Sequence, residues 1–195
     1  MVNGLQRQSG FGMLEVLVSI VIVAVGLLGM AGLSARTMNA EYESYERAQA
    51  LILVSDMVDK INANRKAAGC YAITDPSSGS PALGTASSAT PACSAYGTAE
   101  EQARAVADLN DWNAKLLGAA ETQSGNSVGA IVGARGCVSF DPVANNYQVS
   151  VAWQGMSATV APTTVDPTWL CGSGLYGAEG QRRIVSITVS IANLR

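Results

Sequence analysis

The sequence predicts an α+β protein in which a long N-terminal helix packs on an antiparallel β-sheet. Three observations predict this fold class. An apolar stretch without charge runs from Val16 to Ala35, and a helical pattern without Pro or Gly continues to Lys66. Alternating stretches rich in Val and Ile fill the C-terminal half. We also expect an extra helix and two disulfide-pinned loops.

The uncharged stretch has the length of a membrane-spanning helix, since roughly 20 residues cross a hydrocarbon core. No second stretch qualifies. Arg7 precedes the stretch, whereas Arg36 and then three glutamates follow it, a balance that predicts a cytoplasmic N-terminus. The bulk of the chain is therefore expected outside the cytoplasm.

A cleavable secretory signal is the alternative for this segment. Gly29-Met30-Ala31 loosely fits the small-residue pattern at which such signals are cut. The apolar stretch is longer than the roughly 7 to 15 residues usual for a signal peptide. The helical pattern also continues beyond it, so we expect the stretch to be retained.

An acid, Glu15, stands at the head of the apolar stretch. A carboxylate at membrane depth is costly, and it usually has a partner or a function. The alternative is that Glu15 lies at the membrane surface and reaches into water.

These features together resemble the type IV prepilins. The chain has a short basic leader, a Gly10-Phe11 junction, an acid as the fifth residue after that junction and an apolar helix. The resemblance implies that a prepilin peptidase cuts between Gly10 and Phe11 and that the new amino group of Phe11 is methylated. Glu15 then pairs with the amine of a neighbouring subunit and sets axial register. Gly12 stands where Thr or Ser is commoner.

The resemblance implies the type IV pilin fold and a division of the chain into four parts. The leader occupies residues 1–10, and the transmembrane, filament-core half of the long helix occupies residues 11–35. The amphipathic half follows at 36–68, and a periplasmic globular α+β domain follows at 69–195.

The amphipathic half has an apolar face that predicts packing on the domain. Its members recur at helical spacing and are Ala50, Val54, Met57 and Ile61. Gly69 is expected to stop the helix.

A second helix is predicted from about Ala99 to Leu117. It follows a loop at 74–98 that is rich in Ser, Gly, Pro, Ala and Thr, and Thr98 with Glu101 forms a capping-box signature. The residues expected on its buried face are Val106, Leu109, Trp112 and Leu116. Asp108 and Asp111 are interpreted as solvated acids without a catalytic role.

Three strands are predicted at 131–140, 147–153 and 184–191, the first two joined as a hairpin. Alternation places four residues on the face toward the long helix, namely Tyr147, Val149, Val151 and Trp153. A long connection at 154–180 carries Cys171.

The chain has four cysteines, whose pairing depends on the redox state of the compartment. They are Cys70, Cys93, Cys137 and Cys171. No pair has the C-x-x-C spacing of zinc or redox sites. An even count in a chain directed to an oxidising compartment predicts two disulfides, with three possible connectivities. We favour Cys70 with Cys93 and Cys137 with Cys171, which close the nearest loops. Free buried thiols are the alternative.

Composition argues against several function classes. The chain has no histidine, the commonest general base and metal ligand. Its formal net charge is −3 and its basic residues are scattered, which is not typical of a nucleic-acid surface. We expect no catalytic residue, no metal site and no cofactor, and hence no enzyme.

The C-terminal half resembles one branch of minor pilins, the PilV or type IV pilus modification proteins. The similar stretches are Gly136-Cys137, the strand 151–155 and Gln181-Arg182-Arg183. The resemblance implies assembly with other minor pilins and the major pilin in a priming complex of the inner membrane. The complex then lies at the tip of the extracellular pilus, beneath a tip adhesin. Arg182 and Arg183 either contact a partner pilin or are solvated.

Two other function classes remain open. A pseudopilin of a type II secretion system shares the same N-terminal features. Such proteins often bind calcium through clustered acids, whereas Asp141, Asp166 and Glu179 are dispersed. The other class is a membrane-anchored periplasmic enzyme or binding protein.

Overall fold

One helix, α1 (Met13–Ala63), runs without a break through 51 residues, about 77 Å at 1.5 Å per residue. The computed structural model describes residues 12–86, 89–119, 122–124, 126–127, 129–162 and 170–191. The chain forms two units, one ending at Tyr42 and the other beginning at Glu43. The helix therefore contributes residues to both units. After Ala63 the chain continues in the 3-10 helix η1 (Arg65–Tyr71).

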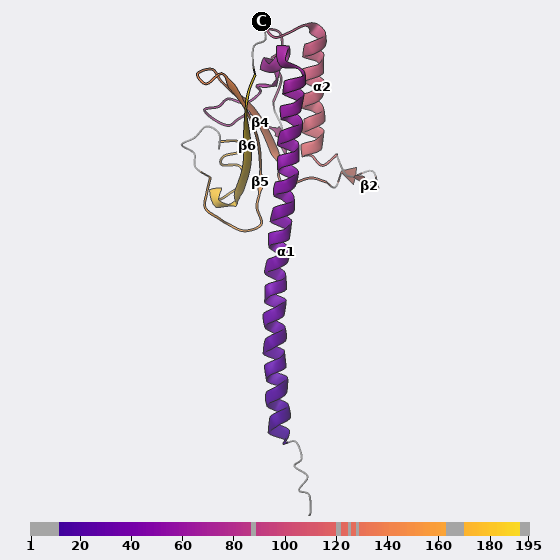
Figure 1. Cartoon of the computed structure of the whole chain (residues 1–195), viewed down its shortest axis with the longest axis vertical. Helices are drawn as coiled ribbons and strands as arrows, with labels where there is room; N and C mark the ends of the chain where they lie inside the picture. Colours follow the sequence, from indigo (N-terminus) through magenta and orange to yellow (C-terminus); the bar gives the residue numbers. More distant parts are fainter. Residues whose placement is uncertain are drawn as a thin grey trace, which may run out of the picture. The chain divides into compact units, whose positions relative to one another are not determined.

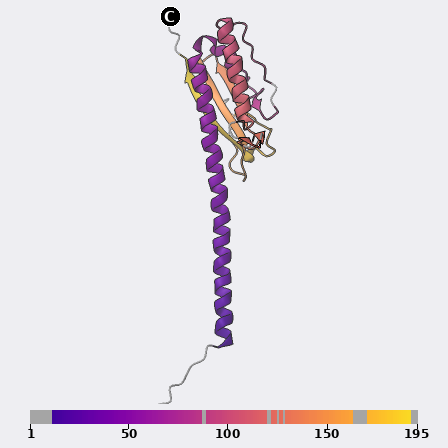
Figure 2. The ribbon, with the colours of Figure 1, turned by 90° about the vertical axis from the view of Figure 1, so that its right-hand side faces the viewer.

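The second unit is built around the predicted apolar face of α1. All four expected residues are fully buried, namely Ala50, Val54, Met57 and Ile61. They lie in one core with residues of α2 and of the sheet. Figures 1 and 2 show this part of α1 beside α2, both against the sheet. The prediction of an amphipathic helix packed on the domain is confirmed, but the predicted end at residue 68, with Gly69 as the stop, is wrong: α1 ends at Ala63, and Gly69 lies within η1.

The extra helix, α2 (Ala99–Leu116), begins at the predicted capping box. The backbone N–H of Thr98 donates to the Glu101 carboxylate at 2.8 Å, and the Thr98 hydroxyl accepts from the Glu101 N–H at 3.3 Å. One predicted core residue is wrong: the side chain of Val106 is 37% exposed, and Ala105 is buried instead. The buried face of α2 therefore runs through Ala105, Leu109, Trp112 and Leu116.

The main sheet has four antiparallel strands in the order β1-β4-β5-β6. These strands are β1 (Leu83–Gly84), β4 (Arg135–Asp141), β5 (Asn146–Gln154) and β6 (Arg182–Ser190). Val149 of β5 lies opposite Val138 and Ile187 on the neighbouring strands. The remaining short elements are β2 (Thr122–Gln123), β3 (Asn126–Ser127) and η3 (Glu179–Gln181). The predicted hairpin is the β4–β5 pair.

Strand β5 is covered on both faces. Val149, Val151 and Trp153 are buried toward α1 and α2, as alternation predicts, and half-buried Tyr147 packs against the same core. A second buried cluster lies on the opposite face and consists of Cys137, Ala152, Cys171 and Tyr176. The Tyr176 hydroxyl lies 2.9 Å from the carbonyl oxygen of Ala152. The loop before β6 therefore closes the outer face of the sheet.

The structure joins Cys137 to Cys171 by a disulfide, as expected, with 5.9 Å between their Cα atoms. This bond ties the loop before β6 to β4. The second expected disulfide is not formed in this structure, in which Cys70 and Cys93 are thiols. The Cys70 thiol instead donates to the carbonyl oxygen of Cys93 at 3.7 Å. Among the described residues the structure therefore contains one disulfide-pinned loop, and the other pairing remains a proposal.

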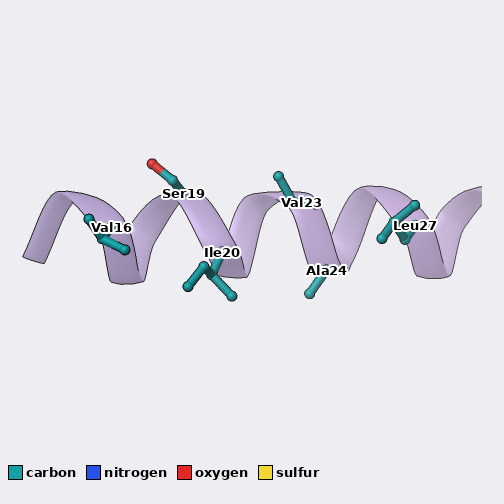
Figure 3. A pocket seen from close by; sticks show the side chains of 6 residues that line it. All are labelled: Val16, Ser19, Ile20, Val23, Ala24 and Leu27. Atoms are coloured by element: carbon teal, nitrogen blue, oxygen red, sulfur yellow. The ribbon is translucent and has the colours of Figure 1, made fainter.

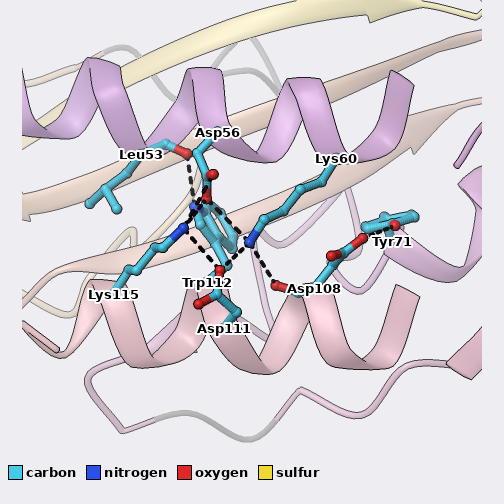
Figure 4. A network of polar contacts seen from close by, with 8 residues as sticks. All are labelled: Leu53, Asp56, Lys60, Tyr71, Asp108, Asp111, Trp112 and Lys115. Carbon is cyan, nitrogen blue, oxygen red and sulfur yellow. Dashed lines mark hydrogen bonds and ion pairs between the residues drawn. The ribbon is translucent and has the colours of Figure 1, made fainter. Parts of the chain in front are cut away.

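Four charged side chains connect α1 to α2 (Figure 4). Lys60 of α1 pairs with Asp111 of α2. Lys115 of α2 pairs with Asp111 at 2.9 Å and with Asp56 of α1 at 3.1 Å. Charges therefore alternate in sign across the helix interface. The expectation that Asp111 is a merely solvated acid is wrong, because it pairs with Lys60 of α1 as well as with Lys115 of its own helix.

Two further hydrogen bonds flank this network (Figure 4). The indole N–H of buried Trp112 donates to the carbonyl oxygen of Leu53 at 2.8 Å. The Tyr71 hydroxyl donates to the Asp108 carboxylate at 2.6 Å. Burial first, and this hydrogen bond second, raises the pKa of Tyr71. A buried Trp or Tyr needs a partner for its polar atom. The Trp112 bond therefore ties α2 to α1, and the Tyr71 bond ties α2 to η1.

The ion pairs predict a pH-dependent stability. The hydrogen bond from Lys60, followed by that from Lys115, holds the pKa of Asp111 below its ordinary value. The contribution of Asp111 is thus present above about pH 3.9 and is lost as the pH falls through the lower, folded-state pKa. The hydrogen bond to Asp111 raises the pKa of Lys115. That contribution is present below about pH 10.4 and is lost as the pH rises through the higher value.

We expect Asp111→Asn to lower the thermal unfolding midpoint at pH 7 by about 2–4 °C, the shift that follows from about 1 kcal/mol in a domain of this size. The difference from wild type should shrink as the pH is lowered toward 2, because the wild-type carboxylate then becomes protonated. Thermal melts of the full chain in detergent measure this. Asp59→Asn, at an exposed position of α1 outside the network, is the control and should shift the midpoint little. An Asp111→Asn difference that is the same at pH 7 and pH 2 would contradict the assignment.

Candidate membrane-anchoring and assembly site

Glu15 lies in the first turn of α1 with its side chain exposed. Its backbone N–H donates to the carbonyl oxygen of Gly12 at 2.9 Å, and its own carbonyl oxygen accepts from the Ser19 hydroxyl at 2.7 Å. The N-terminal end of a helix carries a partial positive charge, which favours a carboxylate there. The backbone thus fixes the position of Glu15 at the start of the helix and leaves the carboxylate available to a group outside the chain.

The apolar residues after Glu15 are uncovered. Of the described residues, α1 is the one helix that is long and apolar enough to cross a membrane. Its most apolar window of 18 residues has a mean hydropathy of 2.7, and none of that window is buried. Exposing one large apolar side chain to water costs about 1.5–3 kcal/mol relative to burying it. A surface of this kind requires lipid or other apolar helices around it.

The exposed surface includes a continuous apolar strip (Figure 3). All of its six residues project from α1, and they are Val16, Ser19, Ile20, Val23, Ala24 and Leu27. Their spacing of three and four places them along one face of the helix. The Ser19 hydroxyl adds little polarity, because it donates to the carbonyl oxygen of Glu15 within the same helix. This face matches acyl chains or a second apolar helix.

The expected processing junction is not part of this geometry. Gly10 and Phe11 lie outside the described residues. Glu15 is the fourth residue after Phe11. In a mature chain that began at Phe11, the free amino group would therefore be four sequence positions before Glu15.

The paired arginines at the start of β6 do not form the exposed partner surface considered from the sequence. Arg182 is 1% exposed, and its guanidinium donates to Glu179 at 2.7 Å and to the carbonyl oxygen of Cys171 at 3.1 Å. The side chain thereby supports the disulfide loop from inside. The interpretation of Arg182 as a partner contact or a solvated charge is wrong.

Arg183 has a different internal partner, Glu43 of α1. Their side chains are 3.1 Å apart, and Glu43 also accepts from the Ser157 hydroxyl at 3.3 Å. Arg183 donates to the carbonyl oxygen of Ser157 at 2.7 Å. Within the second unit, these bonds hold the start of β6 and the loop after β5 against α1. The sequence gives no spacing signal for a contact between residues so far apart.

No metal-binding geometry is found within the part of the chain that the structure describes. There, no three His, Cys, Asp or Glu side chains gather closely enough to hold an ion. Asp141 and Glu179 belong to local contacts instead: Asp141 accepts from the N–H of Val143 at 2.8 Å, and Glu179 binds Arg182. Asp166 lies outside the described residues.

The N-terminus matches a known motif. Residues 5–31 match the model of the prokaryotic N-terminal methylation motif. The chain carries a type IV prepilin-like signal. The matched residues include the second half of the leader, Glu15 and most of the uncharged apolar stretch. No curated protein and no solved structure matches the chain. The signal and the helix together indicate a membrane-anchored, pilin-like structural protein, and the architecture is consistent with the type IV pilin-like α+β fold.

Proposed function

We propose that this chain is a minor pilin of the type IV pilus, similar to the PilV type, that primes pilus assembly in the inner membrane. It then lies at or near the pilus tip. The observation that carries the proposal is the uncovered apolar helix headed by one exposed acid and preceded by a prepilin-like signal. Its partners are the prepilin peptidase, other minor pilins, the major pilin and a tip adhesin. No nucleic acid is among them.

The proposed processing follows the prepilin pattern. The peptidase cuts between Gly10 and Phe11, on the cytoplasmic side, and the amino group of Phe11 is methylated. The globular unit then faces the periplasm until the subunit enters the extracellular pilus. This orientation is supported by Arg7 before the apolar stretch and by the glutamates after it.

Glu15 is proposed to select the axial register of assembly. Among lipid chains or apolar helices its carboxylate has few polar neighbours, so a cationic amine on an adjacent subunit is strongly favoured. The exposed carboxylate and the apolar strip lie on the same segment of α1. Lateral packing of the strip and pairing of the acid can therefore be satisfied by one neighbouring helix at one axial offset.

The globular unit is proposed to act by presenting surfaces rather than by catalysis. The disulfide loop covers the second face of the sheet, and the side chains of Arg182 and Arg183 bind the loop that precedes β6. A loop fixed in this way offers a stable surface to neighbouring subunits or to an adhesin.

We expect Glu15→Gln to reduce incorporation into surface filaments by more than about tenfold, while membrane insertion and cleavage stay close to wild type. Leaving one member of a buried ion pair without its partner costs about 3–5 kcal/mol, and each 1.4 kcal/mol is tenfold in association. The measurement compares the chain in sheared filaments with the chain in the inner membrane.

The matched control is Glu41→Gln, the same change at an exposed acid of α1 beyond the uncharged stretch. It should leave incorporation near the wild-type level. Equal incorporation of wild type and Glu15→Gln would exclude the pairing role of Glu15.

Deleting the gene distinguishes a minor pilin from a pseudopilin. A priming subunit is needed to start filaments, so we expect the deletion to remove most surface pili and twitching motility and to spare type II secretion. Electron microscopy of surface filaments and assay of secreted proteins measure the two outcomes. Loss of secretion with normal piliation would support the pseudopilin alternative. Normal piliation and normal secretion would favour an unrelated membrane-anchored protein.

A further inference from the structure

The two cysteines outside the disulfide meet where the segment leading to α2 crosses η1. Cys70 belongs to η1 and is fully buried, whereas Cys93 is half-buried at the edge of the core. The sulfur of Cys70 lies 3.7 Å from the backbone oxygen of Cys93. The main chain of one cysteine is therefore in contact with the side chain of the other.

Packing on both sides of the pair holds these segments together. The ring of Tyr96 lies directly on Gly69, where an added Cβ would come within 2.4 Å of the ring. An added Cβ on Gly97 would lie 3.3 Å from the Cβ of Ala67. The Tyr96 N–H donates to the carbonyl oxygen of Cys93 at 3.0 Å, which closes a tight turn beside the thiol pair. Residues 93–97 thus contact η1 at successive points, and the proximity of the thiols belongs to the fold.

We propose that Cys70 and Cys93 form a second disulfide, with Cys93 as the residue that first reacts with an external disulfide and Cys70 as the residue that resolves it. The proposal rests on the proposed function, because that function places the globular unit in an oxidising compartment. The bond fixes the segment that leads to α2 onto η1.

The order of reaction follows from access to the two sulfurs. The thiolate is the nucleophile in disulfide exchange, and an external reagent must reach it. Burial, followed by the neighbouring Cys93 thiol, raises the pKa of Cys70 to about 12. Cys70 therefore carries little thiolate at neutral pH and has no exposed surface. Attack on an external disulfide falls to Cys93.

The chemistry balances in two exchange steps. The Cys93 thiol loses its proton, and its sulfur attacks one sulfur of an oxidising disulfide, such as that of a thiol–disulfide oxidoreductase or glutathione disulfide. The S–S bond of the oxidant breaks, and one thiol leaves. The Cys70 sulfur then loses its proton and attacks the Cys93 sulfur, which releases the second thiol. The chain is oxidised by two electrons, and the oxidant is reduced to two thiols.

The test uses the reduced full-length protein in detergent, treated with glutathione disulfide and then with an alkylating reagent. Peptide mapping without reduction should find Cys70 linked to Cys93 and Cys137 linked to Cys171. Free Cys70 and Cys93 in protein that has formed the Cys137–Cys171 bond would overturn the proposal, as would Cys70 linked to Cys137.

Protein isolated from cells separates this inference from the proposed function. If both bonds form with glutathione disulfide but neither is present in cells, the pairing holds and the proposed compartment fails. If cells contain the Cys137–Cys171 bond and alkylatable Cys70 and Cys93, the compartment holds and the pairing fails.

A matched pair of variants tests the order of attack. In Cys70→Ser the remaining Cys93 should form a mixed disulfide with glutathione at least about tenfold faster than Cys70 does in Cys93→Ser. The Cys137–Cys171 bond, mapped in both variants, reports that each has folded. Equal rates, or a faster Cys70, would overturn the assigned order.

Discussion

One helix has to satisfy two environments, and the rest of the structure depends on this constraint. From Glu43 onward α1 is part of a domain, and Val54, Met57 and Ile61 are fully buried in its core. Before Tyr42 the same helix carries an apolar surface. None of its most apolar window is buried within the chain. The exposed surface therefore needs lipid or other subunits, and a lone acid on it needs a counter-charge.

The second unit fixes the helix to the sheet by contacts of different kinds. Apolar burial supplies most of the stabilisation, whereas the Lys60–Asp111 and Lys115–Asp56 pairs and the Trp112 indole bond set the register between α1 and α2. Beyond the sheet, the disulfide loop covers the face that the helices leave open.

Periodic and local signals were readable from the sequence, because they depend on neighbours within a few residues. They include the apolar face of α1, the Thr98–Glu101 cap and the β4–β5 hairpin. Strand β1 was missed, since two residues carry no period. The roles of Arg182 and Asp111 were also missed, because burial and the 51-position separation of Asp111 from Lys60 arise only in the fold. Whether Val106 or Ala105 is the buried residue depends on how α2 is rotated against its neighbours, and the pattern of one helix does not show this.

The candidate site was predictable from the sequence only in part. Glu15 is placed by its own helical turn, but the counter-charge that we propose for it is on another subunit and so lies beyond one chain. Mass spectrometry of the mature protein from cells with an active prepilin peptidase tests the central claim most directly. We expect the chain to begin at Phe11 with a methyl group on its amino nitrogen. A mature chain that begins at Met1, or one that is cut after Ala31, would contradict the assignment of Glu15 and of the anchored helix.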